Sequence, residues 1–234
     1  MNRGTKSPAE GLEDFRMILG ASLSLLALLI GFTLSMSING FNSRQAGEEM
    51  EAAAINAAYI RMDLLPAEDG PKIQSLLIDY LDKRLQFYGT HAPLKQKNIH
   101  LETIDIQNKL WSSISLAANS KQTPITALTV TGINDVLSTQ RKTQANWRNQ
   151  IPLAAWLLLS LVAACCNVML GYNARGVRRS AALLLILPLM ISMSFMMIGD
   201  IDAPGRGIIR VKPVNLEFLN ETLKTHRTLT TLSQ

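Results

Sequence analysis

The chain has 234 residues, of which 47% are hydrophobic, 6% aromatic and 18% charged. This balance is too apolar and too poor in charge for a typical soluble domain. The formal net charge is +5, and no basic stripe interleaved with aromatic residues accompanies it, so no nucleic acid partner is expected.

The first apolar run, residues 17–39, follows a polar tail formed by residues 1–16. Met17 to Ile38 contain no charged residue, and a helix of about 22 residues is about 33 Å long, which matches a hydrocarbon core of about 30 Å. The run is too long for the apolar part of a signal peptide, and no clear small-x-small cleavage site follows it. We therefore expect it to be a retained transmembrane helix.

Two further apolar runs, residues 151–171 and 181–199, are also long enough to cross a bilayer. A segment in lipid must satisfy its own backbone hydrogen bonds, so each run is predicted to be a helix. Residues 40–150 between the first and second runs have helical periodicity throughout, and no strand pattern. The sequence thus predicts an all-α integral membrane protein with three transmembrane helices and a helical extramembrane domain. Residues 200–234 are expected to form a turn and a short amphipathic helix.

The distribution of basic residues leaves the orientation open. The short loop 172–180 carries three arginines and would normally stay in the cytoplasm, which favours a periplasmic position for residues 40–150. Basic residues before the second run and after the third argue for the opposite orientation. The loop arginines are Arg175, Arg178 and Arg179. The basic residues that argue for the opposite orientation are Arg141, Lys142 and Arg148 before the second run, and Arg206, Arg210 and Lys212 after the third.

No catalytic or metal-binding pattern is present. The histidines (His91, His100 and His226) lack metal-ligand spacing, and there is no zinc-protease, nucleophile-elbow or phosphate-loop motif. Cys165 and Cys166 are adjacent, so on a helix they point about 100° apart and are poor disulfide partners. We expect no enzyme activity, no metal and no cofactor.

Small residues line one face of the first run. Such a face lets helices approach closely, either within the chain or as an oligomer seam or pore wall. In the second run a polar amide lies at membrane depth, where it would serve as interhelical glue or as a pore ligand. These residues are Gly20, Ser24, Ala27, Gly31 and Ser35 in the first run and Asn167 in the second.

The stretch "EAAAINAAYIRMDLLP", residues 51–66, is unusually rich in alanine. Its short side chains fit close packing on several sides, either around an oligomer axis or in a plain helical core. In both cases Glu51 and Arg61 would be at least partly buried, so both are candidates for buried ion pairs.

Four segments, in this order and spacing, resemble the bacterial bestrophin-like domain family of membrane proteins. They are "LLALLIGFTLSMS" (25–37), the alanine-rich stretch, "INDVLSTQR" (133–141) and "GDIDAPGRGIIRVKP" (199–213). The family usually has Asn, Arg and Phe where this chain has Ala53, Ala203 and Gly205.

The resemblance implies a channel. Bestrophins are pentameric anion channels with an apolar neck, and "LLIGF" places Leu28, Gly31 and Phe32 where the bestrophin neck helix has Phe-x-x-Gly-Phe. Leu28 and Phe32 share a face, with Met36 one turn on, and apolar rings of this kind can gate by dewetting. The same three residues could instead face lipid or pack.

The function implied is a homo-oligomer, a pentamer by resemblance, that passes chloride or another small ion across the bacterial inner membrane. The alternative is a non-conducting, membrane-anchored helical sensor or scaffold that acts through residues 40–150. In bestrophins the region equivalent to residues 40–150 is cytosolic, the opposite of what the short basic loop favours.

Overall fold

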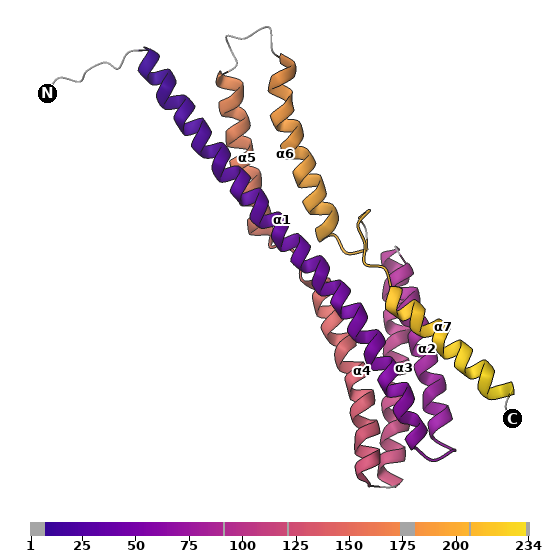
Figure 1. Ribbon diagram of the computed structural model, residues 1–234. Coiled ribbons are helices and arrows are strands. Elements are labelled where there is room, and N and C mark those ends of the chain that lie inside the picture. Colours follow the sequence, from indigo (N-terminus) through magenta and orange to yellow (C-terminus); the bar gives the residue numbers. More distant parts are fainter. Residues whose placement is uncertain (1–7, 91, 121, 174–180, 206, 233–234) are drawn as a thin grey trace. The chain divides into compact units, whose positions relative to one another are not determined.

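The computed structural model describes residues 8–90, 92–120, 122–173, 181–205 and 207–232, and these residues contain helices and no strand (Figure 1). The predicted all-α membrane fold is confirmed. In chain order the elements are α1 (Pro8–Arg61), the short 3-10 helix η1 (Met62–Leu64), α2 (Gly70–Gly89), α3 (Pro93–Ser120), α4 (Pro124–Arg148), α5 (Leu153–Asn173), α6 (Ala181–Asp202) and α7 (Val214–Leu232).

The helices form two compact units, and α1 contributes to both. The first unit, the membrane unit, consists of Met1–Asn39 and Gln150–Ala203, and the second, the helical unit, of Gly40–Asn149 and Pro204–Gln234. Three helical stretches of the described chain, Glu10–Leu64, Pro124–Tyr172 and Leu185–Asp202, contain windows long and apolar enough to cross a membrane. Which residues lie within the lipid stays a prediction, and most of the basic loop, residues 174–180, lies outside the described residues.

The membrane unit has a small apolar core between α1, α5 and α6. Leu26 of α1 is buried with Leu159 and Cys166 of α5 and Ile191 of α6. The Ser37 hydroxyl donates a hydrogen bond to the Ile198 carbonyl at 3.1 Å. One face of α1 therefore packs on the other two apolar helices of its own chain.

The helical unit has a larger core to which α1, α2, α3, α4 and α7 all contribute. Pro71 lies in the first turn of α2, and a capping box closes the first turn of α4, where the Thr123 hydroxyl accepts the Thr126 N–H at 3.1 Å. Gly132 of α4 leaves room for the Arg61 side chain of α1, since a Cβ at this position would lie 3.2 Å from Arg61 Cδ.

The carboxyl-terminal helix is longer than the sequence predicted. Helix α7 has 19 residues, and Leu216, Leu219 and Leu223 pack into the core of the helical unit. The apolar spacing of these leucines gives the helix one buried face, and tertiary packing on α2 stabilises it.

Candidate functional site

The three neck candidates of α1 lie on the face turned away from the core of the membrane unit. Leu28, Phe32 and Met36 are 54%, 62% and 50% exposed, whereas Leu26 and Ser37 are 2% and 1% exposed. These three large apolar side chains thus have no packing partner that buries them among the described residues of their own chain.

The small-residue face of α1 is exposed as well. Gly20, Ser24, Ala27, Gly31 and Ser35 are all exposed. A Cβ at Gly20 or Gly31 would meet no atom within 4 Å. Within the described part of one chain, no helix occupies this face.

Asn167 bonds to its own helix. Its amide Nδ2 donates to the Ala163 carbonyl at 2.9 Å, and its Oδ1 is buried without a hydrogen-bond partner among the residues that the structure describes. Among the described residues the Asn167 amide thus bonds within α5, and its role as interhelical glue or as a pore ligand stays a prediction.

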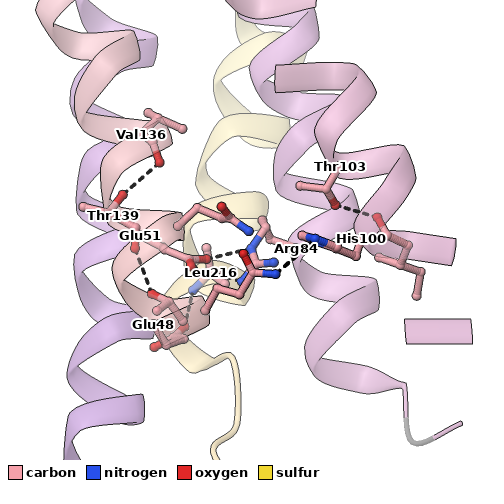
Figure 2. A network of polar contacts seen from close by, with 12 residues as sticks. Glu48, Glu51, Arg84, His100, Thr103, Val136, Thr139 and Leu216 are labelled. Atoms are coloured by element: carbon pink, nitrogen blue, oxygen red, sulfur yellow. Dashed lines mark hydrogen bonds and ion pairs between the residues drawn. The ribbon is translucent and has the colours of Figure 1, made fainter. Parts of the chain in front are cut away.

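Glu51 forms a buried ion pair with Arg84 of α2 in the helical unit (Figure 2). The Arg84 Nε donates to Glu51 Oε2 at 2.8 Å and Nη2 donates to Oε1 at 3.0 Å, a bidentate geometry that is strong for a carboxylate. The two side chains are 1% and 3% exposed. Arg84 also lies over the rings of Phe87 and Tyr88, at 4.7 Å and 5.5 Å from their centroids.

The pair holds Arg84 in its charged form. Burial alone would lower the pKa of Arg84, but the Glu51 carboxylate beside it raises that pKa above its ordinary value. Burial, and then the negative charge of Glu51, raises the pKa of Tyr80 and of Tyr88. The two phenols therefore stay protonated next to the ion pair.

Glu48, one turn before Glu51, binds the start of α7 (Figure 2). Its Oε1 accepts the backbone N–H of Leu216 at 2.9 Å, and its Oε2 accepts the Asn215 side-chain amide at 2.7 Å. Glu48 is 1% exposed. The first N–H groups of a helix have no partner within it and carry a partial positive charge, so a carboxylate there is stabilised.

Arg61 pairs with Asp135 of α4 and not with Glu51. Its Nη1 lies 3.6 Å from the Asp135 carboxylate, and the two side chains are 30% and 51% exposed. This is a partly solvated ion pair, in contrast to the buried pair of Glu51 and Arg84.

Sequence reasoning did not single out Arg84 or Glu48, although Arg84 has a recognisable signal. It lies on the apolar face of α2, in register with the buried residues Ile73, Leu77 and Leu81. A lone cation on a buried face needs a buried anion, and this is what Glu51 supplies.

The segment 199–213 has two structural roles. In the membrane unit the Asp202 carboxylate accepts the backbone N–H of Ile151 at 3.0 Å, which joins the end of α6 to the chain just before α5. In the helical unit Gly205 has a φ of +77°, which favours glycine. A Cβ there would also lie 3.3 Å from the Trp147 ring. No group of three or more His, Cys, Asp or Glu that could hold a metal gathers in the described ranges.

The fold and these sites define an all-α membrane protein in which the described residues leave an apolar face of α1 uncovered. The model of the Bestrophin-like domain matches residues 15–216, and the chain belongs to this family. No curated protein sequence matches the chain.

Three crystal structures of a bacterial bestrophin homologue from Klebsiella pneumoniae, each with one mutation, have a similar fold. Two of them match with TM-scores of 0.65 and 0.66 at 14% identity, over 88% of this chain and 85% of that chain. The third matches with a TM-score of 0.63 at 14% identity, over 93% and 90% of the two chains. The family expected from the sequence segments is thus confirmed.

Proposed function

We propose that the chain forms an oligomeric channel for small ions, anions such as chloride first, in the bacterial inner membrane. The exposed line of Leu28, Phe32 and Met36 carries this proposal. On a helix of a Bestrophin-like domain, such a line would become a ring of apolar side chains once several copies surround an axis. A narrow apolar ring blocks ions when it dries and conducts when it is wet.

The oligomer is part of the proposal, because a single line of side chains does not enclose a pore. A closed ring requires each copy to present the same surfaces around one rotation axis. The exposed small face with Gly20 and Gly31 would serve as the seam, because small residues allow neighbouring helices to approach closely. A pentamer is the state that the likeness to bestrophins supports.

The test of conduction is the purified full-length protein in a planar bilayer with a chloride gradient. We expect single-channel currents whose reversal potential follows the chloride gradient. Phe32→Ala should change the conductance or the open fraction. Leu157→Ala, at a 63% exposed position of α5, is the matched control and should leave both unchanged. No current in any salt would refute conduction, and an unaltered current in Phe32→Ala would remove Phe32 from the neck.

The seam is tested by the mass of the protein in detergent or nanodiscs. Gly31→Leu should shift the oligomer towards monomer, since the added side chain would occupy the proposed seam. Gly171→Leu is the control, because a Cβ at Gly171 also has open space around it. A wild-type monomer under all conditions would exclude the seam.

For the orientation we propose that residues 40–150 lie in the periplasm, as the short basic loop 172–180 favours. A reporter fused after the last residue tests this directly. A signal from the cytoplasm alone would reverse the orientation.

A second candidate function is a non-conducting sensor or scaffold formed by the helical unit. It is supported by the separate core of this unit and by its two buried carboxylates, Glu48 and Glu51. This candidate gains if the purified protein carries no current.

A further inference from the structure

The segment that follows α6 exposes several large apolar side chains within a short stretch of sequence. Ile208 is 83% exposed, Val214 is 60% exposed and Phe218 is 71% exposed. Two basic side chains, Arg210 and Lys212, are exposed between the first and second of these apolar residues.

This segment, residues 207–218, is held in place in the helical unit. Val211 packs against the core of the unit, and Leu216 is fully buried in it. Gly207 is buried, and its carbonyl accepts a hydrogen bond from Arg210 Nε. Because the backbone is anchored at these points, the exposed side chains are directed outward by the fold.

The length of the chain keeps the start of the segment close to the end of a membrane span. Ile208 follows Asp202, the last residue of α6, by six residues. Six residues reach at most about 20 Å when fully extended. Ile208 therefore lies within about 20 Å of the last residue of α6, whose apolar stretch is a candidate membrane span.

We propose that residues 207–218 form a lipid-binding surface, in which Ile208, Val214 and Phe218 enter the membrane interface and Arg210 and Lys212 bind anionic headgroups. Apolar side chains with interleaved cations are the pattern of segments that lie in the interface, and each cation near an anionic surface adds to the attraction.

The composition of the segment favours lipid over a second copy of the chain as the partner. Lysine is depleted at protein interfaces, whereas arginine is enriched there, so it is the exposed Lys212 among the apolar side chains that favours lipid. The segment also carries one exposed carboxylate, Glu217, and the next turn of α7 carries Glu221. Because an anionic headgroup repels a carboxylate, the headgroup contact is assigned to Arg210 and Lys212, at the start of the segment.

The surface is tested by spin labels on the full-length protein in liposomes. Ile208→Cys and Phe218→Cys carry the labels in a background with Cys165→Ala and Cys166→Ala. Asn134→Cys, at an exposed polar position of α4, is the control. Collisions with oxygen, which concentrates in lipid, are compared with collisions with a water-soluble nickel chelate.

We expect the ratio of oxygen to nickel collisions to be several-fold higher at positions 208 and 218 than at position 134. Equal ratios at the three positions would place the segment in water and overturn the proposal. Spin–spin broadening at position 208 that disappears on dilution with unlabelled chain would show that a second copy is the partner, and would also overturn it.

The headgroup contact has its own measurement. With the label at position 208, anionic phosphatidylglycerol should raise the collision ratio relative to neutral phosphatidylcholine. The double variant Arg210→Gln, Lys212→Gln should lose this difference, whereas Lys142→Gln, at an exposed site on α4, should keep it. A difference that survives the double variant would exclude Arg210 and Lys212 as the headgroup ligands. These outcomes do not depend on whether the chain conducts ions.

Discussion

Replacing Arg84 by methionine should destabilise the helical unit more than replacing any exposed charged residue. The variant keeps most of the side-chain volume but removes both hydrogen bonds to Glu51, at 2.8 Å and 3.0 Å, and leaves a carboxylate that is 1% exposed without its cation. Breaking a buried pair in this way costs about 3–5 kcal/mol. Loss of the contacts with the Phe87 and Tyr88 rings adds about 2 kcal/mol, the value for a desolvated cation.

Thermal unfolding in detergent, followed by tryptophan fluorescence, measures this loss. Trp147 is a reporter in the same unit, because its ring lies 5.0 Å from that of Phe87. For a domain of about 150–250 residues, 1 kcal/mol shifts Tm by about 2–4 °C, so loss of the ion pair in Arg84→Met, about 3–5 kcal/mol, should by itself lower Tm by roughly 6–20 °C. Arg61→Met, which breaks a partly exposed pair at 3.6 Å, is the control and should cost about 1 kcal/mol or less.

The double variant Glu51→Leu, Arg84→Met separates charge from packing. Replacing both partners of a buried pair by apolar groups is often neutral or stabilising, so the double variant should recover most of the lost stability. The reasoning would be refuted if Arg84→Met lost no more than Arg61→Met, or if the double variant were as unstable as the single one.

Two further predictions concern Glu48 and His100. Glu48→Ala removes the acceptor of the Leu216 N–H. Since a hydrogen bond to a charged group contributes about 1.5–3 kcal/mol, hydrogen exchange of the Leu216 amide should become about 10- to 100-fold faster. An unchanged exchange rate would contradict the capping role of Glu48. Burial, and then the charges of Arg84 and Arg148, lower the pKa of His100. The unfolded chain therefore takes up this proton first, and stability should fall as the pH drops below about 6.5. The free energy of unfolding of His100→Gln should fall less over this range; an equal fall in both proteins would show that His100 does not cause it.

The helices could be predicted from the sequence because local signals specify them. Charge-free runs of membrane length, Pro71 at the start of α2 and the spaced leucines of α7 each depend on neighbouring residues only. The partners across the helical unit could not be predicted in this way. Glu51 and Arg84 are 33 residues apart, and although Arg84 lies on the apolar face of α2, no local signal pairs it with Glu51.

The outward face of α1 shows a different limit of sequence reasoning. The spacing of Gly20 and Gly31 is equally suited to packing within one chain and to packing between chains. The structure argues against packing within the chain at these positions, because both glycines have open space beside them among the described residues. Whether lipid or a second copy fills that space depends on molecules other than the single chain.

Glu48 and Glu51 together explain why the helical unit has one arrangement of helices. Apolar side chains alone tolerate shifted packing, since leucines recur along α2 and α7 and one leucine can replace another. A shift of α2 by one turn, about 5.4 Å, would still bury leucines but would carry Arg84 away from Glu51 and leave two unpaired buried charges. A shift of α7 would likewise withdraw its first N–H groups from Glu48. Because an unpaired buried charge costs several kcal/mol, the two carboxylates of α1 penalise the shifted arrangements and select the register of both neighbouring helices.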